Sequence, residues 1–444
     1  MSGSGEGLAG WAEAVIRLEP PLPMGGYAAR REPARSVHDP LQVRALALGA
    51  PGSALVLAVA DLLAVERSLV TRIRRRLAGR RPRTTLWLAA THTHSGPEVG
   101  RLLGAEPAPG VEEAVAEATL VAAERALSAM RPVRASWASL PVEGVATPRD
   151  HPETGGPLEL DLLVLEDAEG DRAVFGSFPC HPTVLGESNL ALSADLPGAF
   201  RRRLAERLGG DAWVTLATGA AGDVSTRHTR RAQDFGEVER LGDLLAARAE
   251  EALGGRRPLA AGPLRLVRRR LRLPAKEPPD PAALAELEAG LRERLAAARE
   301  AGREGEARTL VTALQGVEAA RRMGVAGAPT RLEAELDAAA WGSLRLATVP
   351  GELYHRPGDA VRRAAGLPTL LLGYANGYLG YLPERQAYGQ PDYEVLISPA
   401  GAGAAERVVA ALSGMLADFG EAGARRGGPR EGGEAGEADG RGGG

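Results

Sequence analysis

The sequence predicts an α/β fold in which mixed α+β sheets are flanked by helices. Short apolar runs rich in Val and Leu alternate along the chain with Ala/Arg/Glu segments of helical period, the pattern expected of strands interleaved with helices. An apolar fraction of 44% and a charged fraction of 25% are typical of a globular protein. The 444 residues could form one large domain or two to three ordinary ones. We expect one large domain over residues 12–420.

The expected strands are the short apolar runs bounded by polar or Gly/Pro residues, namely 53–59, 84–90, 160–165, 173–178, 212–217, 344–349 and 369–373. The expected helices have apolar residues at helical spacing, and they cover 67–78, 111–129, 198–207, 237–253 and 407–419. Residues 280–324 form a separate pattern, with leucines at helical spacing on either side of a Gly-containing break. We expect a helical hairpin inserted in the domain, with Asp280 as N-cap and Pro281 at the first helical position.

The two ends of the chain differ from the middle in composition. Residues 421–444 are almost exclusively Gly, Ala, Glu and Arg, which predicts a disordered tail because so little apolar surface is available to offset ordering entropy. The first residues carry no basic patch followed by an apolar run, so no secretory signal is expected. No run of apolar residues is long enough to cross a bilayer. The chain reads as soluble and cytoplasmic, and secretion by an unrecognised route stays open.

Charge and composition exclude several classes of function. A net charge of -3 gives no general attraction for nucleic acid. Lys276 is the only lysine, so neither a Walker A motif nor a Ser-x-x-Lys pair can be present, and its Pro- and Glu-rich surroundings read as an exposed linker. The single Cys180 rules out an intramolecular disulfide and is expected to be a core thiol.

Arginine is concentrated between Arg72 and Arg83, where it fills seven of twelve positions. Such a run could form a patch for anionic lipid headgroups. The alternative is that it forms the solvated face of a helix and its exit turn, and we favour that reading because nearly every basic residue of this chain is arginine.

Polar clusters follow five of the expected strands, at the end where each strand stops. They are Thr91-His-Thr-His-Ser-Gly-Pro97, Pro179-Cys-His-Pro-Thr183, Thr218-Gly-Ala-Ala-Gly-Asp-Val-Ser225, Pro350-Gly-Glu352 and Tyr374-Ala-Asn-Gly-Tyr-Leu-Gly-Tyr381. Ligands of α/β sheets bind outside the carboxyl ends of strands, so these clusters are expected to build one site. If the chain is extended there, two histidines two residues apart project to the same side.

The residue types in these clusters suit a metal. Neutral imidazoles, a carboxylate and a phenol form a donor set that zinc accepts, with a water completing a catalytic site. Each residue alone has a simpler interpretation: His181 as a core histidine, Glu352 as an acid at a helix N-terminus, and Tyr381 as a packing residue. Their joint position at strand ends favours a metal site.

The same motifs, in this order, resemble the catalytic domain of the neutral/alkaline non-lysosomal ceramidase family. Pro23-Met-Gly-Gly-Tyr27 and His38-Asp-Pro-Leu41 resemble the opening of that family, so the likeness runs from about residue 18 to residue 419. The resemblance implies a zinc-dependent amidohydrolase that cleaves a linear amide, such as N-acyl-sphingosine or another lipid N-acyl substrate. It implies one Zn²⁺ per chain and leaves homo-oligomerisation open.

The resemblance also implies roles for individual residues. His92, His181, Glu352 and Tyr381 would be the zinc ligands. His94 and Arg149 would contact the substrate and stabilise developing negative charge, and Tyr378 would contribute to substrate binding. Ser225 would be either the nucleophile or the group that positions the attacking water; we favour the water mechanism, because no sequence feature marks a base for Ser225.

The chain departs from the family in several places. Thr226 follows Ser225 where the family usually has proline, Pro148 replaces an asparagine before Arg149, and no immunoglobulin-like C-terminal domain follows. The ceramide assignment is therefore weaker than the hydrolase assignment. Two alternatives remain: a metal-dependent esterase or deacetylase on the same fold, and a non-catalytic scaffold. A metal-independent serine hydrolase is disfavoured, because no Gly-x-Ser-x-Gly elbow occurs.

Overall fold

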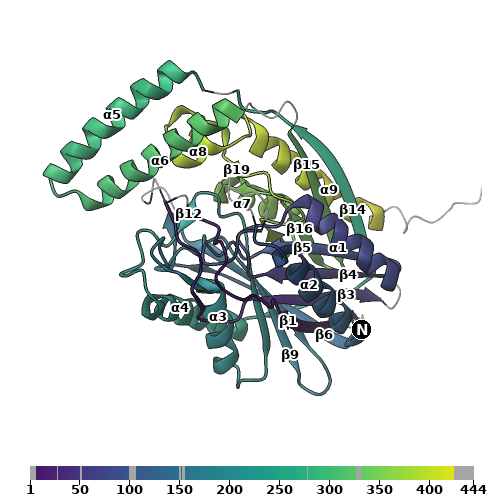
Figure 1. The fold of residues 1–444 in the computed structure, drawn as a ribbon. Coiled ribbons are helices and arrows are strands. Elements are labelled where there is room, and N and C mark those ends of the chain that lie inside the picture. The colour runs from purple at the N-terminus through teal and green to yellow at the C-terminus, as the bar shows by residue number, and fades with distance from the viewer. Residues whose placement is uncertain are drawn as a thin grey trace, which may run out of the picture.

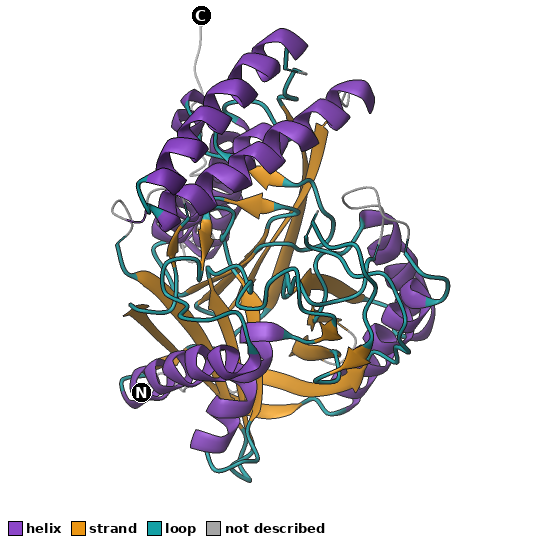
Figure 2. Ribbon diagram, turned by 60° about the vertical axis from the view of Figure 1, so that its left-hand side comes forward, coloured by secondary structure: helices purple, strands orange, loops and turns teal. Residues whose placement is uncertain are grey.

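The computed structural model describes residues 7–424, apart from residues 28, 51–52, 100–106, 150–151, 153–155, 278 and 327–331. Two β-sheets pack face to face, and helices cover the outer face of each (Figures 1 and 2). The predicted mixed α/β class is therefore confirmed. No helix among the described residues is long and apolar enough to cross a membrane.

The first sheet contains strands from both halves of the chain. Its order is β11 (Trp213–Thr218), β9 (Arg172–Phe178), β8 (Leu158–Glu166), β6 (Arg131–Val142), β1 (Gly7–Val15), β3 (Gln42–Ala50), β4 (Ser53–Ala60) and β5 (Thr84–Ala90), with β13 (Arg257–Leu259) beside β6. Its two ends contain the parallel pairs β11–β9 and β4–β5, whereas the pairs between them are antiparallel. The sheet curls enough that Thr218 Oγ1 donates to Thr91 O at 2.6 Å, which joins the ends of β11 and β5.

The second sheet and three short strand pairs complete the β structure. The second sheet has the order β14 (Leu264–Leu273), β15 (Leu332–Trp341), β16 (Leu344–Thr348) and β18 (Thr369–Leu372). The short pairs are β2 (Ser36–Val37) with β10 (Ala191–Leu192), β7 (Thr147–Pro148) with β12 (Val224–Ser225), and β17 (Glu352–Leu353) with β19 (Tyr381–Leu382). Two of these short pairs carry residues of the predicted site.

Apolar side chains alternate between the two faces of each strand, so each sheet packs against an apolar core on both of its faces. In β4, Val56 and Ala58 face the helices α1 (Arg67–Arg80) and α2 (Val111–Ser128), whereas Leu55 and Leu57 face the second sheet. Side chains of a strand alternate between faces, so a strand buried on both sides reads as a continuous apolar run. Helices α3 (Asp195–Arg207) and α4 (Phe235–Gly254) cover the other half of the first sheet.

The outer face of the second sheet is covered by α7 (His355–Ala365) and α9 (Ala404–Ala424). Helices α5 (Pro281–Glu300) and α6 (Glu304–Ala326) form a hairpin that extends away from the sheets and packs on the short helix α8 (Tyr393–Ile397) (Figure 1). A 3₁₀ turn, η3 (Arg385–Gly389), precedes α8. Asp280 caps α5, its side chain accepting from Ala282 N.

The predicted strands and helices are all present, with ends shifted by a few residues. Sequence reasoning missed β1, β3, β6, β14, β15 and α7. Strand β14 is dense in arginine because it pairs with the acidic strand β15. Helix α7 has Pro357 and Gly358 in its first turn, which weakens its helical pattern. Helix α9 continues to Ala424, and the rest of the predicted tail lies outside the described residues.

Two further expectations concern Lys276 and the arginine run between Arg72 and Arg83. Lys276 is not in an exposed linker: it is half-buried, and its Nζ donates to Leu396 O at 2.8 Å and to Val395 O. The arginines of α1 form ion pairs with the acids of α2, such as Arg72 with Glu112 at 3.1 Å. Much of the arginine run is thus the solvated face of a helix that pairs with its neighbour, whereas Arg74 points inward and pairs with Glu335 of β15 at 3.0 Å.

Candidate metal centre

His92 lies in the turn that follows β5, and its backbone is not extended. Its φ of 63° is in the left-handed region, which few non-glycine residues adopt. The expectation that His92 and His94 lie on the same side of an extended chain is therefore wrong. The turn nevertheless buries His92, and its Nδ1 lies 2.6 Å from Leu63 O. A carbonyl only accepts, so Nδ1 carries the hydrogen and Nε2 carries a lone pair.

His181 follows β9 and is fully buried. Its Nδ1 lies 2.6 Å from Ala221 O and 3.1 Å from Val224 O, both in the loop after β11. As with His92, this contact leaves the lone pair on Nε2. Burial first, and then the charge of Arg149, lower the pKa of His181 to about 4, so its imidazole is neutral at pH 7.

Glu352, in β17, presents a carboxylate to both lone pairs. Its Oε2 lies 2.8 Å from His181 Nε2 and 3.4 Å from His92 Nε2, and all three side chains are buried. Burial alone would raise the pKa of Glu352, but His92 and His181 hold it well below the usual range. The carboxylate depends on positive charge beside it for that low pKa, and among the described residues no hydrogen bond of acceptable geometry satisfies His181 Nε2. Lone pairs that face one another in this way need a cation between them.

His94 is the third histidine of the cluster. Ligand atoms of His92, His94 and His181 lie within 4.8 Å of one another, so these three residues can hold a metal ion. His94 Nε2 is 3.3 Å from His92 Nε2, and burial lowers its pKa well below the usual range. Unlike the other two, His94 is only part-buried, and its Nδ1 has no hydrogen-bond partner among the described residues. No backbone carbonyl fixes its ring as a metal ligand usually requires.

Three tyrosines surround Glu352. Tyr378 donates its hydroxyl hydrogen to Oε1, and the Tyr374 hydroxyl lies 3.4 Å from Oε2. Tyr381 is paired in register with Glu352 across β17 and β19, and its ring lies nearly parallel to that of His181 with centroids 6.3 Å apart. Burial, followed by the carboxylate of Glu352, raises the pKa of each hydroxyl well above the usual value. Tyr378, which was expected to bind the substrate, therefore contacts Glu352, which was expected to bind the metal.

Arg149 and Ser225 lie beside the cluster on the pair β7–β12. Ser225 is bridged to His181 by backbone pairing, and its Oγ accepts from Arg227 N at 3.2 Å. The Arg149 guanidinium lies 5.6 Å from the centre of the Tyr381 ring and donates to Gly222 O. All of the predicted site residues that the structure describes therefore gather in one region.

Several residues near the site were not predicted. Glu394 of α8 forms an ion pair with Arg149 at 2.7 Å, and the ring of Tyr393 contacts that of Tyr381 with centroids 6.2 Å apart. No motif marks α8, whose five residues are too few to show a period. His355 lies 2.5 Å from Asp223 through Nδ1, and the pair fixes the start of α7 to the loop before Ser225.

The other histidines and the cysteine lie away from the cluster. His38 stacks on Phe235, His228 contacts Arg149 O at 2.8 Å, and His151 is outside the described residues. Cys180 is buried in the core beneath α3 and α4, as expected of a core thiol.

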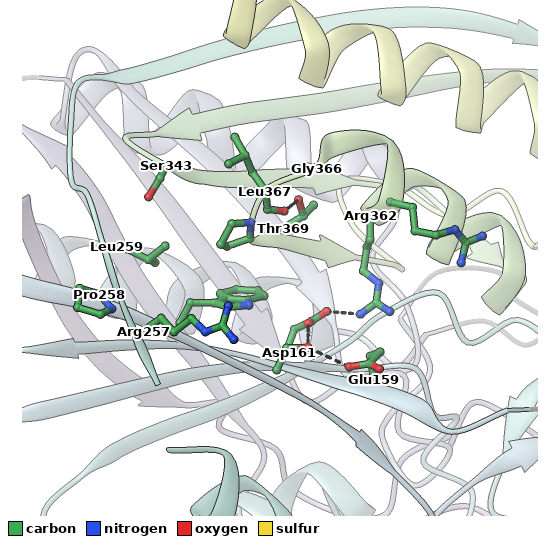
Figure 3. A pocket seen from close by; sticks show the side chains of 14 residues that line it. Glu159, Asp161, Arg257, Pro258, Leu259, Ser343, Arg362, Gly366, Leu367 and Thr369 are labelled. Carbon is green, nitrogen blue, oxygen red and sulfur yellow. Dashed lines mark hydrogen bonds and ion pairs between the residues drawn. The ribbon is translucent and has the colours of Figure 1, made fainter. Parts of the chain in front are cut away.

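A separate groove of about 600 Å³ lies between β8, β13 and the end of α7 (Figure 3). Its floor contains Asp161, which Arg362 contacts at 2.5 Å and Ser139 at 2.7 Å. Apolar residues such as Leu259 and Leu367 form its sides. None of the predicted site residues lines this groove.

Comparison with solved structures identifies the fold. The crystal structure of neutral ceramidase from Pseudomonas aeruginosa matches 94% of this chain and 75% of its own, with a TM-score of 0.74 and 20% sequence identity. A structure of ceramidase complexed with C2 matches 95% of this chain and 76% of its own, with a TM-score of 0.74 and 21% identity. No family model and no curated protein matches the sequence. The resemblance predicted from the motifs is thus confirmed at the level of structure, and the chain has the fold of neutral ceramidase.

Proposed function

We propose that this chain is a zinc-dependent hydrolase that cleaves a linear amide bond in an N-acyl substrate of the ceramide type. One observation carries the proposal: the lone pairs of His92 Nε2 and His181 Nε2 converge on the carboxylate of Glu352 inside the protein. Such an arrangement is unfavourable without a cation and is what a metal site requires. Two imidazoles, a carboxylate and a phenol suit zinc better than calcium or magnesium, which prefer oxygen ligands.

The proposed ligands are His92, His181, Glu352 and Tyr381. Contacts behind them support this set, since both ligand histidines bind backbone carbonyls and Glu352 accepts from Tyr378. When bound, zinc supplies Lewis acidity and lowers the pKa of a coordinated water to about 7.

The remaining residues are proposed to act on the substrate side. His94 is neutral, and its imidazole lies beside His92, so it is proposed to hydrogen-bond the substrate next to the metal. Ser225 Oγ accepts from a backbone amide, which leaves its hydroxyl hydrogen available to orient an attacking water. Arg149 supplies positive charge near Tyr381, where negative charge would develop on a carbonyl oxygen.

The substrate class rests on the shared fold, because the two solved structures compared above are ceramidases. An amide with an apolar acyl chain is therefore the first substrate to test. O-acyl esters and N-acetyl compounds separate this proposal from an esterase or a deacetylase.

The test is metal analysis combined with a substrate panel. We expect one zinc per chain in the wild type, and its loss together with amide hydrolysis in the double variant His92→Ala, His181→Ala. The control is His38→Ala, which removes a histidine outside the cluster and should change neither property. Stoichiometric zinc in the double variant would refute the ligand assignment, and hydrolysis of esters alone would refute the amidase assignment.

A further inference from the structure

Helix α8 is a short element that the inserted hairpin holds against the site. Leu396 packs into the apolar interface between α5 and α6. On its other side, Lys276 Nζ donates to Leu396 O at 2.8 Å, and Lys276 N donates to Pro399 O at 2.9 Å. The hairpin itself and the segment that precedes it therefore fix α8 from two directions. A five-residue helix has little stability of its own, so these contacts determine where it lies.

The approach of α6 to α8 depends on Gly316. A Cβ at this position would lie 3.1 Å from Leu396 Cδ1 and 3.2 Å from Tyr393 Cδ2. A side chain there would push α8 away from the hairpin. Gly290, on α5 of the same hairpin, has no atom within 4 Å of such a Cβ. The two glycines therefore offer a matched pair of positions.

On the face of α8 toward the site, Glu394 forms a buried ion pair with Arg149. Their side chains are 1% and 8% exposed, and the distance between Glu394 Oε1 and Arg149 Nη2 is 2.7 Å. The same guanidinium nitrogen donates to Gly222 O, in the loop that leads to Ser225. Arg149 is therefore held between that loop and α8, with its guanidinium beside the ring of Tyr381.

We propose that Glu394 is a positioning residue that orients Arg149, and that the α5–α6 hairpin sets the geometry of the site by fixing α8. The inference rests on the proposed function for the role of Arg149, and it extends that function to a segment with no metal ligand. Glu394 balances the charge of Arg149, which would otherwise oppose the binding of a cation at Glu352. Groups that orient active residues typically change activity by about 10- to 100-fold when they are replaced.

The first experiment is a double-mutant cycle between Glu394 and Arg149 in the full chain. We expect Glu394→Gln to lower kcat/KM by about 10- to 100-fold, and to have no further effect when Arg149 is already Met. If Glu394→Gln proves too unstable, Glu394→Leu in the Arg149→Met background removes both charges, an exchange that buried pairs often tolerate. Activity of that double variant should equal that of Arg149→Met alone.

Two controls test whether the loss of activity comes from Glu394 and from the position of α8. Glu288→Gln removes an acid that pairs with Arg321 on the exposed side of the hairpin, and it should behave as wild type. Gly316→Val should lower kcat/KM as Glu394→Gln does, whereas Gly290→Val should not. Wild-type activity in Glu394→Gln, an undiminished effect in the Arg149→Met background, or equal behaviour of the two glycine variants would overturn the proposal.

Failure of the proposed function is recognised separately. If the wild type hydrolyses no member of the substrate panel, the same cycle is measured as zinc affinity by calorimetry and as melting temperature. Non-additive effects of the Arg149 and Glu394 substitutions would then support the positioning role, and additive effects would refute it.

Discussion

At the scale of single residues, the site depends on protonation states that burial fixes in advance. His181 is neutral at pH 7, so metal binding need not release a proton from its ring. Backbone carbonyls determine the tautomer of His92 and His181, so that Nε2 of each ring is unprotonated and points at the carboxylate of Glu352. In the metal-free protein the same arrangement is a source of instability in acid.

We therefore predict that His181 makes the metal-free protein less stable as the pH falls from 6.5 to about 4. Burial and then Arg149 lower the pKa of His181 from 6.5 to about 4 in the folded protein. Between these values the unfolded chain binds more protons than the folded protein, so the free energy of unfolding falls with decreasing pH. The contribution is on the order of 3 kcal/mol. Urea unfolding at several pH values should show a flatter profile for His181→Gln, and identical profiles would contradict the assignment.

The sequence predicted that the candidate site residues would lie together, but it did not predict their contacts. Motifs at strand ends placed the histidines, Glu352 and Tyr381 in one region, because strand ends are visible as the limits of apolar runs. The left-handed turn at His92 has no such mark, since no glycine or asparagine stands there and histidine, although enriched in this conformation, seldom adopts it. The contacts of Tyr378 with Glu352 and of Arg149 with Glu394 join segments far apart in the chain, and a single sequence holds no record of them.

At the scale of elements, β17 reaches the site only because Gly222 leaves room for it. A Cβ at position 222 would lie 2.3 Å from Glu352 O, and backbone atoms at this distance cannot give way locally. Gly222 N also donates to Leu353 O at 2.9 Å, so the loop after β11 and β17 are tied together. The loop and the ligand strand therefore act as one unit.

Gly222→Ala should consequently destabilise the protein by about 1–3 kcal/mol, as overpacking of a buried site does, and weaken zinc binding. Gly254→Ala is the control, because no atom lies within 4 Å of a Cβ at that helical position. Thermal unfolding and calorimetric zinc titration measure the two effects. Unchanged zinc affinity in Gly222→Ala would show that β17 can shift without moving Glu352.

The ion pairs between α1 and α2 should matter much less. Arg76 is paired with Glu113 at 2.6 Å and with Glu117, at the protein surface. Exposed pairs of this kind contribute less than about 1 kcal/mol, because water and salt screen them. Arg76→Ala should therefore change the urea midpoint only slightly and leave zinc content unchanged. Loss of binding to anionic lipid vesicles in this variant would instead support the lipid-headgroup interpretation of the arginine run.

At the scale of the whole molecule, the two sheets are joined by polar contacts as well as by their apolar interface. Arg362 of α7 contacts Asp161 of β8 at 2.5 Å beneath the groove in Figure 3. Asp161 is buried, and that burial raises its pKa despite the arginine. Sequence periodicity predicted β8 but missed α7, and nothing local encodes the packing of one sheet on the other, so the contact between β8 and α7 could not be predicted.

Replacing Arg362 should loosen this junction without changing the metal centre. Arg362→Met leaves Asp161 without its guanidinium partner, and a loss of about 1–3 kcal/mol in the free energy of unfolding is expected. The neighbouring exposed Arg363→Met serves as the control for loss of charge. Urea unfolding measures stability, and zinc content measures the site. Equal stability of the two variants would show that Arg362 contributes nothing across the junction.

The placement of Glu352 and Tyr381 in β17 and β19 has a consequence for how the protein matures during translation. His92 and His181 leave the ribosome early, but the register that brings Glu352 beside Tyr381 forms only when most of the chain has been made. A nascent chain with β1 to β11 alone would carry His92 and His181 without the carboxylate of Glu352. If these four residues hold a metal as proposed, metal capture is a late event in synthesis, and chains that end before Tyr381 are released without the complete proposed set of ligands.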